Sequence, residues 1–134
     1  MSTALSPQVA AFLADWPDEP MRALFQNLAE LVFGLPDVAC KFVARPGVSY
    51  SLRPRHTAQK ERALFAMIDV IDDQPRWLSV CFYQDMVRDP EAIGDLVPGG
   101  LADSDGYCFD LTETDRFDYV RARLLEAFQA AGGQ

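Results

Sequence analysis

The chain has very little of the side chain that metal sites and many catalytic sites use, since His56 is its single histidine. Its three cysteines contain no C-x-x-C pair, which argues against a structural zinc site. No G-x-S-x-G, P-loop or G-x-G-x-x-G pattern is present, so a nucleophile elbow and the common phosphate-binding loops are also lacking. We therefore assign no catalytic residue, no metal ligand and no cofactor, and we favour a protein that is not an enzyme.

Long apolar runs are also missing. None approaches the roughly 18 residues that span a bilayer, and the first residues, MSTALSPQVAAFLADWP, lack the features of a secretory signal. The cysteines are odd in number, far apart and surrounded by apolar or strand-like neighbours, which predicts three buried free thiols: Cys40, Cys81 and Cys108. We therefore expect a cytoplasmic protein without membrane contact.

Positive charge is scarce and unevenly placed. Lysine and arginine number 12 against 20 acidic residues, and a net charge of −8 argues against a general nucleic-acid binder. Residues 38–62 differ from the rest, because Glu61 is their only acid. The basic residues of this segment are Lys41, Arg45, Arg53, Arg55, Lys60 and Arg62.

Two amphipathic helices are predicted near the start. Ser6 followed by Pro7 is a typical helix start, and this helix would end before Pro17. A second helix would begin at the acidic residues before Pro20. It would end near Gly34, which we expect at the left-handed C′ position.

The most apolar stretch is 62–83, which predicts two strands joined by a turn at 72–75. The second strand alternates, with core residues Leu78, Val80 and Phe82. Its other side would be half-covered or would face a partner in a homodimer, through Trp77, Cys81 and Tyr83. Asp69 interrupts the first strand, either as an edge or outer-face carboxylate or as a functional acid in a pocket.

The remaining segments complete an α+β pattern. Strands are predicted at 38–44 and 48–52 around a turn at Gly47, followed by a polar, basic loop at 54–60 that contains His56. A short helix would run from Asp89 to about Val97, and an acidic loop at 101–106 would lead to a strand at 107–111. A last helix would start with a capping box at Thr112.

This order predicts a single, mostly antiparallel sheet of about five strands with helices packed on one face, in two layers. Residues 1–134 would form one domain, with 1–19 as a helical extension and 20–131 as the α+β core.

The basic segment is the strongest indication of a binding site. Arginines beside an aromatic ring suit a phosphate, a carboxylate or a nucleotide. We therefore expect a small anion or a protein partner to bind at Arg45, Tyr50, Arg53 and Arg55. The alternative is that these residues only balance an acidic surface. A separate group of acidic residues follows later in the chain and includes Asp103, Asp105 and Asp110. These carboxylates could hold a cation, or they could form a solvated acidic rim.

Part of the chain resembles known families. LAELVFGLPDV at 28–38 resembles the helix-to-strand opening of the YdhG-like and YjbR-like small bacterial proteins, and RPGVSY at 45–50 is similar to their first hairpin. Later elements keep the same order over roughly residues 20–131. The resemblance implies a small α+β domain without a catalytic motif. Some YdhG-like members are described as frataxin-like iron chaperones, which adds an acidic iron-binding chaperone as the alternative function. YjbR-like members have been proposed to bind DNA, but their lysine-rich sheet surface is missing outside 41–62.

Overall fold

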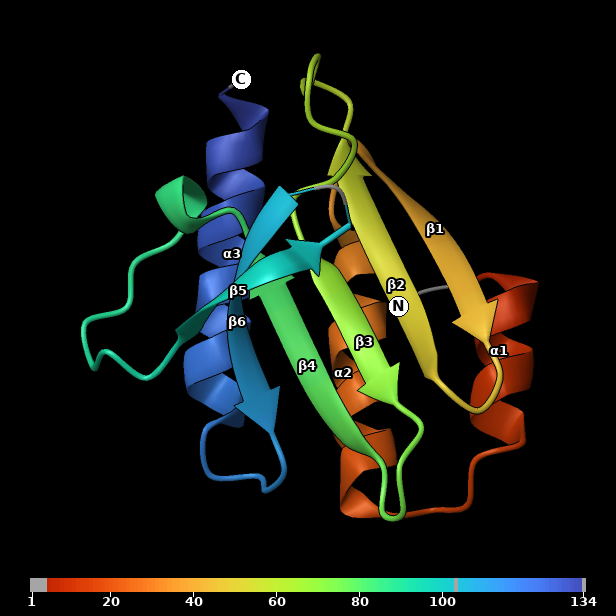
Figure 1. Ribbon diagram of the computed structural model, residues 1–134. Helices are drawn as coiled ribbons and strands as arrows, with labels where there is room; N and C mark the ends of the chain where they lie inside the picture. Colours follow the sequence, from red (N-terminus) through yellow and green to blue (C-terminus); the bar gives the residue numbers. More distant parts are fainter. Residues whose placement is uncertain (1–4, 103, 134) are drawn as a thin grey trace.

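The computed structural model describes residues 5–102 and 104–133, which form one antiparallel sheet of six strands and three α-helices (Figure 1). The strand order is β1-β2-β3-β4-β6-β5. The predicted α+β class is confirmed, with slightly more strands than expected. In chain order the elements are α1 (Pro7–Ala14), α2 (Pro20–Gly34), β1 (Val38–Arg45), β2 (Ser49–His56), β3 (Met67–Ile71), β4 (Trp77–Phe82), the 3₁₀ turn η1 (Gln84–Met86), β5 (Asp95–Leu101), β6 (Ser104–Leu111) and α3 (Phe117–Gly132).

The two N-terminal helices begin where the sequence predicts. Oγ of Ser6 accepts a hydrogen bond from the amide of Val9 at 3.3 Å and so caps α1. Helix α2 includes Gly34 as its last residue, so the predicted C′ position is wrong. The left-handed backbone occurs instead at Asp37, with φ of 60°, directly before β1. Aspartate adopts this conformation more readily than most residues that have a side chain.

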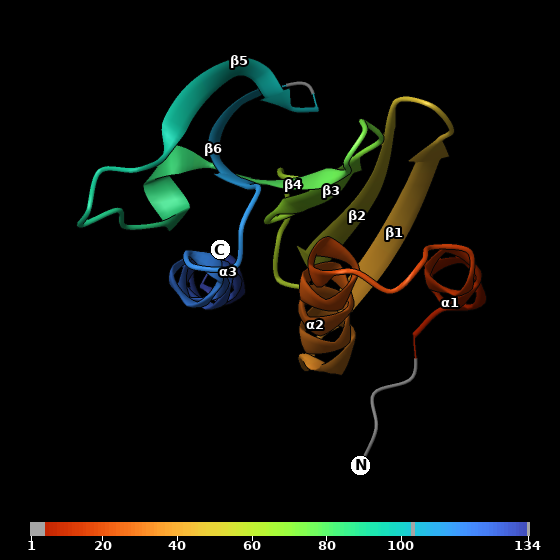
Figure 2. The same ribbon diagram turned by 90° about the horizontal axis from the view of Figure 1, so that it is seen from below.

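The three helices lie on one side of the sheet, and the core lies between the sheet and these helices (Figure 2). Each side chain that alternation assigns to the core in β4 is 0% exposed, namely Leu78, Val80 and Phe82. Helix α1 belongs to the same core, because its Val9 and Leu13, and Trp16 just after it, are no more than 4% exposed. Burying a large apolar side chain contributes about 1.5–3 kcal/mol, so α1 is held firmly on the sheet.

Strand β2 is longer than predicted and includes the first part of the expected basic loop. Its register with β1 is continuous from Ser49 opposite Arg45 to His56 opposite Val38. Pairing with β3 ends at Leu52, so Pro54 lies where β2 has only one strand neighbour. Proline is tolerated in a strand at such positions, which explains why Pro54 does not end β2.

The helix predicted between Asp89 and Val97 is not formed. The carboxylate of Asp89 accepts hydrogen bonds from the amides of Ile93 and Gly94, and the chain then enters β5. Pro98 and the glycines after it lie within β5, where the register with β6 shifts between Val97 and Leu101. Proline and glycine are common in edge strands and bulges, so the same residues that would stop a helix also fit an irregular edge strand.

The last helix starts later than its predicted capping box. Helix α3 begins at Phe117 with Arg116 as its N-cap residue, and no side chain makes a cap hydrogen bond there. The apolar stripe is confirmed, because Val120 and Leu124 are buried against the sheet. In the described ranges, no helix combines the length and the apolar character needed to cross a membrane.

On the other side of the sheet, β5 and β6 curl away from the helices (Figure 2). A second apolar cluster forms there from Leu64, Met67, Cys81, Leu101 and Cys108. Cys81 and Cys108 are directly opposite in β4 and β6 and form a disulfide, so the prediction of three free thiols is wrong. Cys40 is the free cysteine of the described residues, and burial raises the pKa of its thiol to about 11, which makes it unreactive at neutral pH.

Candidate functional site

Four basic side chains share the outer face of β1 and β2, which is the face turned away from the helices. Phe42 of β1 and Leu52 of β2 pack in the core under the helices. Because side chains alternate along a strand, the odd-numbered residues of both strands lie on the opposite face. Four of these residues are basic and are called the basic surface below: Lys41, Arg45, Arg53 and Arg55.

Like charges face each other directly within the basic surface. Lys41 and Arg53 are Cα partners in the register of β1 and β2, and like charges at such positions destabilise a sheet. The ion pairs of the described chain involve three other arginines, namely Arg62, Arg76 and Arg123. The four charges therefore remain without an acidic partner within 4 Å among the described residues.

The arginines of the basic surface keep hydrogen-bond donors for a ligand. Nε of Arg53 donates to Oγ of Ser51 at 3.0 Å, and one terminal nitrogen of Arg55 donates to the carbonyl of Gln59 at 2.7 Å. A guanidinium carries five N–H donors, so each group can still bind a carboxylate or a phosphate in bidentate geometry. The existing bonds hold the side chains in place without using their binding capacity.

Asp69 lies beside the basic surface. It is an outer-face carboxylate, which is one of the two positions predicted for it from the sequence. In the register of the sheet it is opposite Ser51 of β2 and Ser79 of β4, so it is on the outer face. Burial raises the pKa of Asp69 above its usual value, although the Ser51 hydroxyl and the charges of Arg53 and Arg45 act in the opposite direction. Its Oδ1 is buried without a hydrogen-bond partner. The carboxylate is thus partly desolvated and near cations.

Replacing Asp69 with asparagine is expected to raise the free energy of unfolding at pH 7 by about 1 kcal/mol, because it removes a poorly solvated charge. The pKa of this group is raised in the folded state, so the ionised carboxylate costs stability above the unfolded value of about 3.9. The gain from the substitution should therefore vanish near pH 3. Urea unfolding at both pH values measures it, with the exposed Glu113→Gln as control. An equal gain at both pH values would contradict the conclusion that the ionised carboxylate of Asp69 destabilises the folded protein.

The structure separates Tyr50 from the three arginines that were grouped with it. Its ring lies 4.4 Å from that of Phe12 between centroids, and its hydroxyl donates to Oδ2 of Asp72 at 3.4 Å. Tyr50 is therefore on the helix-facing side of the sheet and stabilises the packing of α1. The alternation that places Tyr50 with Leu52 is visible in the sequence and would have excluded it, whereas Lys41 was missed because the register of β1 was not known.

His56 is the last residue of β2 and is partly buried, not an exposed loop residue. Its Nδ1 accepts a hydrogen bond from the amide of Ala58 at 3.0 Å, and its ring lies 5.5 Å from that of Phe128 between centroids. Across the described residues, no serine hydroxyl or cysteine thiol is hydrogen-bonded to it. The histidine therefore has a packing role against α3.

The acidic residues considered as an iron site are not brought together. Asp105 and Asp110 are both on β6, five positions apart, which is about 16 Å along a strand. Asp103 lies outside the described residues. Where the structure describes the chain, no group of three histidine, cysteine, aspartate or glutamate residues could hold a metal ion.

The residues expected at a homodimer contact do not form one open patch. Cys81 is only 3% exposed and is part of the disulfide. Tyr83 packs against the second apolar cluster, and the guanidinium of Arg62 lies 3.9 Å from the centre of its ring. Nε1 of Trp77 donates to Asp73 at 2.7 Å.

Comparisons with protein-family models, with curated proteins and with solved structures each find no match to this chain. The resemblance to the YdhG-like and YjbR-like proteins therefore stays a prediction. The function of the protein is best inferred from the charges and the register of the basic surface.

Proposed function

We propose that this protein is a binding domain that takes up an anionic ligand on the basic surface and does not catalyse a reaction. The observation that carries the proposal is the position of Lys41 directly opposite Arg53, with no acid within 4 Å in the described chain. A bound anion relieves the repulsion between these cations, which makes binding favourable. The ligand class is a small molecule with phosphate or carboxylate groups. An acidic segment of a protein partner presents the same groups and is the alternative ligand.

A long nucleic acid fits this surface less well. The whole chain has a net charge of −8, and outside residues 38–62 there are 19 acidic residues and 6 basic ones, so the remainder would repel an extended polyanion. A small anion contacts only the basic surface and avoids most of that repulsion. The proposal is therefore restricted to compact anions.

The cytoplasmic location predicted from the sequence also remains a proposal. The Cys81–Cys108 disulfide weighs against it, because disulfides persist mainly in oxidising compartments. The iron-binding chaperone remains the alternative function, supported by the acidic composition alone. In the described chain it has no ligand group to act through.

The proposal is tested by reversing two charges of the basic surface. Arg53→Glu combined with Arg55→Glu is expected to weaken the binding of pyrophosphate, citrate or ATP by at least about 10-fold, or 1.4 kcal/mol. Calorimetry at low, fixed salt measures the dissociation constants. The matched control is Arg88→Glu combined with Arg121→Glu, which changes the net charge equally but away from β1 and β2. If none of these anions binds the original protein, or if both double variants bind alike, the proposal fails.

A further inference from the structure

Strand β1 forms one edge of the sheet, and its long side is open. It is the first strand in the spatial order and pairs with β2 alone (Figure 1). All eight of its residues are at least partly exposed. An edge strand of this kind presents backbone groups that another chain can bind.

The register shows which backbone groups of β1 point outward. The carbonyl of Asp37 accepts a hydrogen bond from the amide of Thr57 at 2.9 Å, and this pair directly precedes Val38 opposite His56. Bonded and non-bonded pairs alternate along an antiparallel ladder, so the odd-numbered residues of β1 bond to β2. The even-numbered residues direct their N–H and C=O groups outward, namely Val38, Cys40, Phe42 and Ala44. In the described chain, no backbone hydrogen bond of a turn, loop or cap uses these groups.

A strand added at this edge would have two different faces. On the outer face it would lie beside Lys41 and Arg45, at the 4.5–5.5 Å Cβ spacing typical of cross-strand neighbours. On the helix face it would lie beside Phe42, whose ring is 5.6 Å from that of Phe12 between centroids. Both rings are only partly buried. The edge therefore fits a strand that alternates acidic and apolar side chains.

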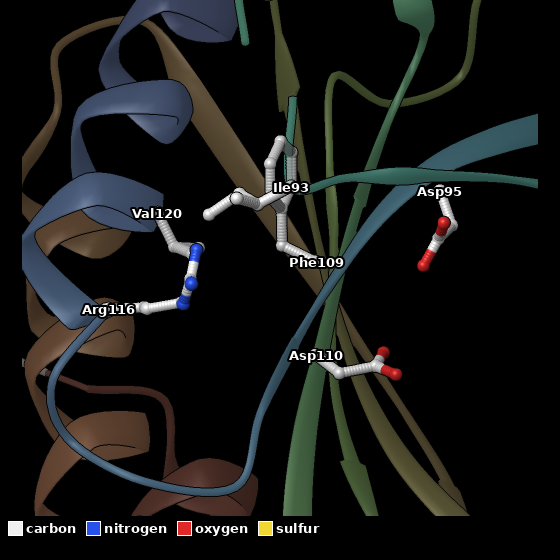
Figure 3. Close-up of a pocket in the computed structure, with 6 residues that line it drawn as sticks. All are labelled: Ile93, Asp95, Phe109, Asp110, Arg116 and Val120. Carbon is white, nitrogen blue, oxygen red and sulfur yellow. The ribbon is translucent and has the colours of Figure 1, made fainter. Parts of the chain in front are cut away.

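The charges of the sheet direct an acidic segment to β1 and not to the opposite end. Asp110 is opposite Ser79 in the register and Asp95 is opposite Cys108, so both acids are on the outer face. Figure 3 shows their carboxylates turned toward one another on one side of β6. Partial burial and the charge of Asp95 both raise the pKa of Asp110. An acidic segment is repelled there and attracted at β1.

A second copy of this chain fits the β1 edge less well. Pairing of two copies through this edge would bring two sets of basic side chains together, and like charges on neighbouring strands are destabilising. A partner with acidic side chains is attracted to the same positions.

We propose that an acidic, extended segment of a protein partner adds to the free edge of β1 as a further strand. Its backbone bonds to Cys40, Phe42 and Ala44. Its carboxylates lie beside Lys41 and Arg45, and its apolar side chains lie beside Phe42. The inference rests on the proposed function, because it uses the same basic surface, and it specifies the protein segment that this surface takes up.

The probe is the synthetic peptide acetyl-Glu-Val-Glu-Val-Glu-Val-Glu-amide, titrated into the full chain by calorimetry at low, fixed salt. It is expected to bind with a dissociation constant of about 0.1 mM. The control acetyl-Glu-Glu-Glu-Glu-Val-Val-Val-amide has the same composition and charge but cannot place its acids on one face. It should bind at least about 10-fold more weakly. Equal binding of the two peptides, or no binding of the first up to about 2 mM, would overturn the inference.

N-methylation of the alternating peptide tests the backbone contacts without changing any charge. One version carries methyl groups on the valine amides and the other carries them on the glutamate amides. Only one of these sets faces β1, whichever direction the added strand runs. One version should therefore bind at least about 10-fold more weakly than the other. If both versions bind alike, no strand is added.

A variant of β1 separates this inference from the proposed function. Ala44→Pro removes an outward N–H, which an edge strand tolerates, and leaves every charge of the basic surface in place. It should weaken the alternating peptide at least about 10-fold and leave pyrophosphate binding unchanged, whereas the control Ala44→Ser should bind both normally. If Ala44→Pro binds the peptide normally, strand addition is wrong. If pyrophosphate does not bind the original protein, the proposed function fails.

Discussion

Removing the Cys81–Cys108 disulfide is expected to lower the free energy of unfolding by about 3 kcal/mol, the largest effect of the changes considered. The two cysteines are 27 positions apart, so the bond closes a long loop and restricts the unfolded chain. Both sulfur atoms are also buried in the second apolar cluster, and replacing them with alanine removes packing contacts there. The loss should therefore exceed that of a typical surface substitution several times.

Urea unfolding of Cys81→Ala combined with Cys108→Ala, without reductant, measures this loss. Cys40→Ala is the control, because Cys40 is the cysteine outside the disulfide. Thiol titration of the unfolded original protein should detect one reactive thiol without reductant and three after reduction. Three thiols before reduction would show that the bond is not formed, and would favour the cytoplasmic location.

Replacing Asp89 with asparagine is expected to lower the free energy of unfolding at pH 7 by about 2–3 kcal/mol, because bonds to a charged acceptor are stronger than bonds to a neutral one. Two backbone amides and two tyrosine hydroxyls donate to this one carboxylate. In asparagine an NH2 group replaces one carboxylate oxygen, so it would point at some of these N–H and O–H donors and could not accept their hydrogen bonds. Thermal unfolding measures the change, and Glu91→Gln in the same segment is the control for a lost exposed charge.

The same substitution should change how stability depends on pH. Burial alone would raise the pKa of Asp89, but the bonds from Tyr107, Tyr119, Gly94 and Ile93 hold it well below its usual value. A lowered pKa in the folded state means that this stabilisation is complete above the unfolded value of about 3.9 and is lost as the pH falls below it. The difference between the original protein and Asp89→Asn should therefore shrink from pH 5 toward pH 2. A difference that stays constant over this range would contradict the role of the charge.

The sequence correctly predicted structural features that depend only on residues close together in the chain. The cap at Ser6 and the alternation of Leu78, Val80 and Phe82 each depend on neighbouring residues, and both are present in the structure. The disulfide depends on β4 and β6 being neighbours across a long connection, which no local pattern reports. Pro98 and Gly99 fit both the end of a helix and a bulged edge strand, so only tertiary structure distinguishes the two.

Only part of the candidate site was predicted, because local patterns do not report which strands pair or in which register. The excess of basic residues in 38–62 is visible in the composition, but the face on which each residue lies depends on the register of β1 and β2. Alternation separates Tyr50 from Arg53, whereas the addition of Lys41 needed the pairing of the two strands.

Strand β5 ends the sheet in a way that prevents further strands from being added there. Pro98 has no N–H to offer, and the register shift between Val97 and Leu101 interrupts the spacing of the backbone groups on that edge. The β5 end of the sheet is therefore a poor template for a strand of a second chain, and edge-to-edge aggregation through this end is disfavoured.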